Sequence, residues 1–235
     1  MLDVGNMNPK KVAATAPDVK NVRFRDAFPH PGVIVVMGKR GSGKTALAMW
    51  VMEEYHKQRG FVGAVYKAPK AMKELLPDWV ETPSQLTRLP KNSVVVIDEA
   101  QQVANARRSS STENLDLAQC VALSRQRNQL IFLISHHSRK LDMLDLMDAS
   151  RIIFKQPTAG QVLFERPELK PFSQRAVNKF AERKGNLQKL AYVMNFETLT
   201  FGFTAAKMPT FWTNSLSTAM AGLGKGFGTG GPLLQ

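Results

Sequence analysis

Short runs of almost continuously apolar residues alternate with longer amphipathic segments from Val33 onward. The apolar runs are Val33–Met37, Phe61–Tyr66, Val94–Ile97, Gln129–Ile134 and Ile152–Phe154. A strand without apolar–polar alternation has both faces covered, as the strands of a parallel sheet between helices do. The pattern therefore predicts an α/β fold with a central, mainly parallel sheet flanked by helices.

The segments between these runs have the length and periodicity of helices. They are Thr45–Arg59, Leu115–Arg127, Ser138–Ala149 and Ser173–Lys184. In the first of them, Leu47, Val51 and Tyr55 recur at helical spacing and form one apolar face. The second follows a candidate capping box from Ser110 to Glu113, which is a typical signal for the start of a helix.

The flanking segments differ in composition from the core, which we expect to span residues 32–155. Residues 1–31 contain scattered prolines and several Lys and Arg, which predicts a basic N-terminal arm with an edge strand around Val22–Phe24. Residues 156–216 gather aromatic side chains and predict a small C-terminal α+β annex packed on the core. Residues 217–235 include GLGKGFGTGG and predict a flexible glycine-rich tail.

A phosphate-binding motif follows the first predicted strand. The sequence GKRGSGKT, from Gly38 to Thr45, fits G-x-x-x-x-G-K-[ST], a match expected by chance in roughly one chain of this length per hundred. The glycines let the backbone approach phosphate oxygens, and the following helix points its positive end at them. Lys44 would neutralise the β and γ phosphates, and Thr45 would bind Mg²⁺. The predicted nucleotide-binding residues are Gly38, Gly41, Ser42, Gly43, Lys44, Thr45 and Ala46.

Two adjacent acids follow another buried strand, in SVVVIDEA from Ser93 to Ala100. Asp98 is placed to hold Mg²⁺ through water, and Glu99 to act as general base on an attacking water. With the strand-like run that precedes them, these acids resemble the additional-strand, catalytic-glutamate division of RecA-like P-loop ATPases. That resemblance implies ATP and Mg²⁺ as cofactors and water as the acceptor of the phosphoryl group.

The stretch LSRQRNQLIFLISHH, from Leu123 to His137, is similar to A-R-x-x-G-h-h-h-h-h-A-T-Q of the FtsK/HerA superfamily of DNA-pumping ATPases. Arg125 falls on the family's arginine, and His136 falls on its γ-phosphate-sensing glutamine. ASRIIFK, from Ala149 to Lys155, resembles the family strand that opens with an arginine finger, which places Arg151 in that role. The resemblance covers about Val33 to Lys155. Within the superfamily, the chain most resembles the DNA-packaging ATPases of viruses with internal-membrane, double-jelly-roll capsids.

Each of these residues has an alternative interpretation. His136 and His137 can form half of a metal site or belong to a polar loop without function, although no Cys, His or Asp cluster at ligand spacing accompanies them. Arg151 can cap a helix or pair with Asp148. Arg125 and Arg127 can be subunit-interface charges or helix C-terminal charges, so the sequence leaves open which arginine acts in trans.

Charge and composition restrict the partners. The formal net charge of +13 favours polyanions such as nucleic acid. Arg107 and Arg108, in the polar stretch ANARRSSSTEN, are candidates for contacting DNA phosphates from a pore loop, or for a solvated loop. The single cysteine, Cys120, excludes an internal disulfide. No apolar run approaches the roughly 20 residues that cross a bilayer, so no transmembrane segment is expected.

The resemblance implies an ATP-hydrolysing motor that translocates double-stranded DNA and packages a viral genome into a preformed capsid. An arginine finger supplied by a neighbour implies a homo-oligomeric ring, a hexamer or a pentamer. Partners would be capsid or membrane vertex proteins, in the cytoplasm of the infected host or at the virion vertex. The alternatives are a Zot-like phage assembly ATPase with membrane partners, a P-loop kinase acting on a small molecule, and a nucleotide-gated switch without turnover.

Overall fold

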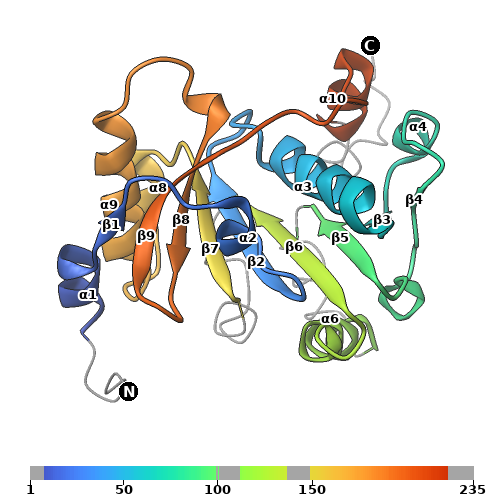
Figure 1. The fold of residues 1–235 in the computed structure, drawn as a ribbon, viewed down its shortest axis with the longest axis horizontal. Coiled ribbons are helices and arrows are strands. Elements are labelled where there is room, and N and C mark those ends of the chain that lie inside the picture. Colours follow the sequence, from blue (N-terminus) through green and yellow to red (C-terminus); the bar gives the residue numbers. More distant parts are fainter. Residues whose placement is uncertain (1–7, 99, 101–111, 137–148, 222–235) are drawn as a thin grey trace, which may run out of the picture.

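The computed structural model describes residues 8–98, 100, 112–136 and 149–221, and their strands form one sheet of nine (Figure 1). The strands are β1 Asp18–Val19, β2 Gly32–Gly38, β3 Val62–Val65, β4 Val80–Glu81, β5 Ser93–Ile97, β6 Gln129–Ser135, β7 Arg151–Lys155, β8 Leu190–Asn195 and β9 Thr200–Ala205. The helices are α1 Pro9–Thr15, α2 Phe24–Ala27, α3 Lys44–Arg59, α4 Lys70–Lys73, α6 Thr112–Leu123, α8 Ala159–Leu163, α9 Lys170–Ala181 and α10 Asn214–Ala221, with 3₁₀ turns η2 Leu86–Arg88 and η5 Leu187–Lys189.

The strand order is β1-β9-β8-β7-β2-β6-β5-β3-β4, and most neighbouring strands are parallel. The exceptions are β8, which runs antiparallel to β7, and β9, which runs antiparallel to β8. β6 lies between β2 and β5, which agrees with the additional-strand architecture that the sequence resemblance implies. The predicted fold class, a mainly parallel sheet flanked by helices, is confirmed.

Helices cover both faces of the sheet, as the continuous apolarity of its strands predicts. Val33, Val35 and Met37 of β2 face a core shared with α1, α6 and α9. Ile34 and Val36 of the same strand face a second core with α2, α3, α4 and α10. All seven residues of β2 are buried, so this strand lies at the centre of the molecule and holds the loop that follows it in a fixed place.

The predicted helices agree with the structure in part. α3 begins one residue before Thr45 and ends at Arg59, where Gly60 adopts the left-handed conformation of a C-cap. α6 ends at Leu123 rather than Arg127, because the chain turns there and Asn128 takes a positive φ before β6. The helix expected over 138–149 and the capping box at Ser110 fall outside the described residues, apart from Ala149 itself.

The N-terminal arm is more structured than expected, and the edge strand lies elsewhere. β1, not Val22–Phe24, pairs with β9 in parallel register. Val22 still donates its amide to Phe203 O at 2.8 Å. Phe24 instead begins α2, because its ring reaches Trp50 of α3 at a centroid distance of 5.5 Å and is partly buried there. The arm is therefore held on the sheet by backbone pairing and by an aromatic contact.

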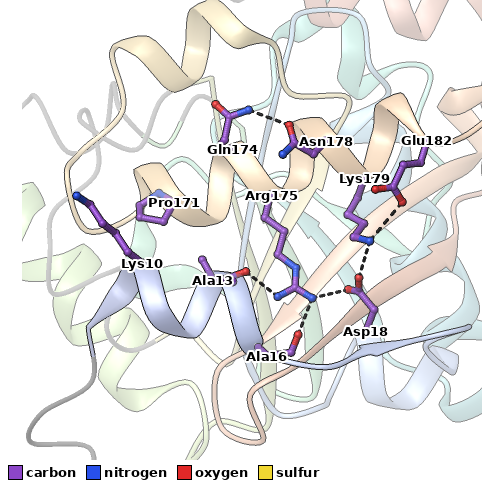
Figure 2. Close-up of a pocket in the computed structure, with 11 residues that line it drawn as sticks. Lys10, Ala13, Ala16, Asp18, Pro171, Gln174, Arg175, Asn178, Lys179 and Glu182 are labelled. Atoms are coloured by element: carbon purple, nitrogen blue, oxygen red, sulfur yellow. Dashed lines mark hydrogen bonds and ion pairs between the residues drawn. The ribbon is translucent and has the colours of Figure 1, made fainter.

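α1 lies against α9, and one arginine joins them, as Figure 2 shows. Arg175 donates to Ala13 O at 2.8 Å and to Ala16 O at 2.6 Å, both at the C-terminal end of α1. Its guanidinium also pairs with Asp18 at 3.0 Å, and Lys179 pairs with the same carboxylate at 3.0 Å. These contacts join the two helices beside an open cavity of about 620 Å³.

The C-terminal part continues the central sheet. β8 pairs with β7 and β9 pairs with β8, so the boundary expected at residue 156 falls between neighbouring strands of one sheet. Phe172 and Phe180 of α9 pack on Phe201 and Phe203 of β9 with edge-on ring contacts. The domain boundaries remain a prediction, and most of the expected tail lies outside the described residues. No helix in the described ranges is long and apolar enough to cross a membrane.

Candidate functional site

The candidate site lies at the edge of the sheet where the carboxyl ends of β2, β5, β6 and β7 meet (Figure 1). β2 leads directly into the loop from Gly38 to Thr45. Asp98 follows β5, His136 follows β6 and Lys155 ends β7. Because neighbouring parallel strands end at the same edge, residues far apart in the sequence are brought together here.

The glycines of the loop are required by its backbone. Gly38 has φ +147°, and a Cβ at this position would lie 1.9 Å from the backbone oxygen of Lys155. Gly41 and Gly43 have φ of 72° and 83°, in the left-handed region that other residues rarely adopt. The predicted loop therefore wraps back over the end of β2 and brings the chain to the start of α3.

This loop has unused groups that fit an anion. No side chain caps the first turn of α3, so its N-terminal amides are available for a phosphate. The Ser42 hydroxyl is fully buried and has no hydrogen-bond partner among the described residues. A buried hydroxyl without a partner costs about 1–3 kcal/mol, a cost that a bound phosphate oxygen would offset. The residues present thus fit a nucleoside triphosphate.

Lys44 is buried in the first turn of α3, with its ammonium inside the curve of the loop. Nζ donates to Gly38 O and to Lys39 O, both at 3.0 Å, and lies 3.1 Å from His136 Nδ1. These neutral partners hold the ammonium where the predicted β and γ phosphates would bind. A doubly charged phosphate group is a stronger partner for an ammonium than a carbonyl oxygen.

Thr45 and Asp98 meet as the metal-binding interpretation requires. The Thr45 hydroxyl donates to Asp98 Oδ2 at 2.7 Å, across 53 residues of sequence. A hydroxyl and a carboxylate side by side are suitable oxygen ligands for Mg²⁺, which keeps most of its own waters. Glu99, the predicted general base, lies outside the described residues, so its role remains a prediction.

His136 is neutral in this arrangement. Burial lowers its pKa below the ordinary value of 6.5, and the nearby charge of Lys44 lowers it further. An ammonium can only donate, so Nδ1 accepts from Lys44 and the ring proton is on Nε2. A neutral imidazole with its proton on Nε2 can donate to a phosphate oxygen, as the glutamine of the FtsK/HerA pattern would. Gln161 of α8 fixes the backbone here by donating to His136 O at 3.0 Å.

A cavity of about 960 Å³ opens beside the loop, and the C-terminal segment supplies its far wall. The wall residues, which the sequence did not point to, are Asn186, Gln188, Lys189, Ala205, Ala206, Lys207, Met208, Trp212 and Ser217. Thr210 anchors this segment to α3, since its amide donates to the buried Glu53 carboxylate at 3.0 Å. The mixture of apolar side chains and cations suits a nucleoside with a charged phosphate tail.

Lys155 also lines this cavity and was missed from the sequence. Its side chain is almost fully buried at the end of β7, next to the phosphate loop. The available signal was its position: it is the residue opposite Gly38 in the parallel pairing of β7 with β2. That pairing could not be derived from the local sequence.

Arg151 lies at the opposite end of the same strand. It pairs with Ile34, four residues before the start of the phosphate loop. Its buried guanidinium donates to Asp26 O at 3.0 Å and pairs with Glu197 at 2.9 Å. An arginine finger has to reach the phosphate of a neighbouring subunit. The contacts to Asp26 and Glu197 hold the guanidinium within its own chain, and the role of Arg151 as a finger for a neighbouring subunit stays a prediction.

The other predicted charges lie away from the cavity or outside the described residues. Arg125 and Arg127 precede β6, at the end of the strand opposite His136, and Arg127 donates to Leu89 O. Arg107, Arg108 and His137 lie outside the described ranges. Within those ranges no group of three or more His, Cys, Asp or Glu side chains could hold a metal ion. Cys120 is buried in the core.

Comparisons with known proteins agree with this fold. Residues 30–140 match the family model described as AAA domain. The genome-packaging NTPase B204 of Sulfolobus turreted icosahedral virus 2, in complex with AMPPCP, aligns with a TM-score of 0.53 at 13% identity, over 76% of this chain and 99% of that chain. B204 of Sulfolobus turreted icosahedral virus, named as a DNA-packaging ATPase, aligns with a TM-score of 0.54 at 13% identity, over 76% and 98% of the two chains.

A conjugation coupling protein, TcpA of pCW3, aligns with a TM-score of 0.50 at 9% identity, over 81% of this chain and 64% of that chain. The curated proteins contain no significant match to the chain. At these identities the likeness shows the fold alone, and the phosphate site within it stays a prediction that the loop geometry fits. Residues 30–140 thus resemble the AAA domain model, in a chain that has the P-loop NTPase fold.

Proposed function

We propose that this protein is an ATP-hydrolysing motor that translocates double-stranded DNA and packages a viral genome into a preformed capsid. The observation that carries the proposal is the meeting of Lys44, the Thr45–Asp98 pair and His136 at one edge of the sheet. The similarity of the whole fold to a viral genome-packaging NTPase supports it. The net charge of +13 suits a polyanionic substrate such as DNA.

The site residues divide the work of hydrolysis. Bound Mg²⁺ would neutralise charge on the β and γ phosphates, with Thr45 and Asp98 holding it. Lys44 would exchange its carbonyl partners for phosphate oxygens. Glu99 would take a proton from the attacking water while the bond between the γ phosphorus and the bridging oxygen breaks, giving ADP and phosphate. His136 would donate Nε2–H to a γ-phosphate oxygen and so distinguish ATP from ADP.

Translocation requires contacts beyond this site. We propose that several copies form a ring, a hexamer or a pentamer, in which Arg107 and Arg108 follow the phosphates of DNA and a neighbouring arginine completes each site. Contacts to phosphates are independent of base sequence, as a packaging motor requires. They also weaken steeply as the salt concentration rises. Capsid or membrane vertex proteins would be the partners, in the host cytoplasm or at the virion vertex.

The test is the ATPase rate with and without duplex DNA. We expect duplex DNA to stimulate ATP hydrolysis, and Glu99→Gln to lower the rate by about 100-fold or more while ATP still binds. Arg107→Ala combined with Arg108→Ala should lower the stimulation by DNA and leave the basal rate unchanged. Turnover by a monomer that is indifferent to DNA, or phosphoryl transfer to a small molecule instead of water, would contradict the proposal.

A further inference from the structure

Lys155 is a buried cation that has no role in the mechanism proposed above. Its side chain is 1% exposed, and Nζ donates to Leu190 O at 2.8 Å and to Gln188 O. Both acceptors are neutral, and no carboxylate is bonded to it in the part of the chain that the structure describes. An ammonium has three hydrogens, so one remains after these two bonds. The lysine borders the cavity beside the phosphate loop.

The backbone at Lys155 supports the start of the phosphate loop. Its carbonyl lies against Gly38, where only a hydrogen fits. The next residue accepts a long hydrogen bond from the loop, Lys39 N to Gln156 O at 3.5 Å. The Lys155 side chain then passes beside Gly43, where a Cβ would lie 4.0 Å from Lys155 Cε. A shift of the phosphate loop would therefore displace β7 and the aliphatic part of the Lys155 side chain.

The turn whose carbonyl groups bind Lys155 also contacts the phosphate loop directly. Gln188, in η5, donates its side-chain amide to Gly41 O at 3.3 Å. The same residue offers its main-chain oxygen to Lys155. The segment Leu187–Leu190 leads directly into β8, beside β7 in the sheet (Figure 1). The loop, the lysine and this segment thus form a closed set of contacts.

A buried cation at this position costs free energy of folding, so stability alone does not explain it. Burial lowers the pKa of Lys155 to about 8, because the charged form has lost its water. Apolar side chains of similar volume usually replace a buried charge with little loss, or with a gain, of stability. A negatively charged ligand in the adjoining cavity would offset the cost and favour the charged form.

We propose that Lys155 is a positioning residue of the nucleotide site, which joins the phosphate loop to Leu187–Leu190 so that nucleotide binding fixes the start of β8. The inference rests on the proposed nucleotide site and adds a route by which its occupancy reaches the C-terminal strands. Triphosphate binding attracts the ammonium, and the ammonium carries Gln188 O and Leu190 O with it. β8 and β9 would then differ in order between the loaded and the empty protein.

The experiment uses Lys155→Met in the full chain, with Lys184→Met as the matched control, because Lys184 is exposed and lies outside the cavity. Affinity for the ATP analogue AMPPCP is measured by calorimetry, and amide hydrogen exchange follows 187–195 with and without it. We expect wild type to gain protection over 187–195 on binding. Lys155→Met should bind about tenfold more weakly, as for the loss of one charge-assisted contact, and should lose that protection. Lys184→Met should match wild type in both measurements.

Wild-type affinity together with wild-type protection in Lys155→Met would overturn the inference while the proposed function stands. Failure of wild type itself to bind the analogue would instead overturn the proposed function. If Lys155→Met does not fold, Gln188→Ala decides, since its exposed side chain can be removed without disturbing the core. That variant should lose protection over 187–195, and full protection in it would overturn the inference.

Discussion

A cation is partly buried at one junction of the molecule and fully buried at another, and the two cations differ in what they bind. At the contact of α1 with α9, Arg175 binds two carbonyl groups and the carboxylate of Asp18 (Figure 2). Burial alone would raise the pKa of Asp18, but hydrogen bonds from Tyr192, Lys179 and Arg175 hold it below its ordinary value. Charge at this junction is therefore balanced within the chain.

Beside the phosphate loop, the charge of Lys155 has no bonded carboxylate among the described residues. Lys155 binds carbonyl oxygens, and burial lowers its pKa. Arg151, at the other end of β7, resembles Arg175 instead, since it pairs with the carboxylate of Glu197. The comparison teaches that burial of a cation does not by itself indicate a site. Within the described residues, Lys155 differs from both arginines because it has no carboxylate partner and lies at the edge of a cavity.

The largest expected effect comes from Gly38→Ala. The new Cβ would meet the backbone oxygen of Lys155, which cannot move without displacing β7. We expect the free energy of unfolding to fall by about 3 kcal/mol or more, and nucleotide binding to be lost. Urea unfolding and calorimetry with AMPPCP measure the two effects. Gly60→Ala is the control, because φ is also positive there but the space is open, so a cost of about 1 kcal/mol with normal binding is expected.

Arg175→Met tests the other junction. Removing the guanidinium leaves Ala13 O, Ala16 O and part of the Asp18 charge without their donor. We expect the free energy of unfolding to fall by about 2–3 kcal/mol, with unchanged affinity for AMPPCP. Arg88→Met, at an exposed arginine, should stay within about 0.5 kcal/mol of wild type. A fall in affinity as large as that of Lys155→Met would erase the distinction between the two junctions.

The third expected effect, similar in size to that of Arg175→Met, is a pH dependence of stability. The unfolded chain holds the Lys155 proton up to a pKa near 10.5, and the folded protein releases it at about 8. Between these values the unfolded state binds more protons, so stability rises with pH, and the gain is lost as pH falls towards 8. The free energy of unfolding of wild type minus that of Lys155→Met should therefore rise by about 2–3 kcal/mol between pH 7.5 and 10.

Subtracting the variant cancels the other charged groups that face the cavity, which are Arg40, Lys44, Asp98, His136, Lys189 and Lys207. Urea unfolding at a series of pH values gives the difference. Saturating AMPPCP should move the shift to higher pH, because the triphosphate favours the charged lysine. A difference that stays flat across this range would show that Lys155 keeps its ordinary affinity for protons.

Much of the fold was predictable because its signals are local. The buried strands, the phosphate loop and the acid after β5 each follow from a few adjacent residues, and the structure shows positive φ at the loop glycines and a Thr45–Asp98 hydrogen bond. The roles of Arg151 and Lys155 depend on neighbours that only the folded sheet supplies. Glu197 lies in the turn after β8, and Gln188 lies before it, so no spacing near β7 distinguishes the arginine that pairs with Glu197 from the lysine beside the cavity.

The sheet ends on both sides in a strand of two residues, β1 at one edge and β4 at the other. Strands that short leave few unpaired backbone groups on which a second molecule could build. Copies of this chain are therefore expected to join through side chains of helices and loops, and no continuous sheet should run from one subunit to the next. An assembly of that kind lets each subunit tilt against its neighbours without breaking backbone hydrogen bonds.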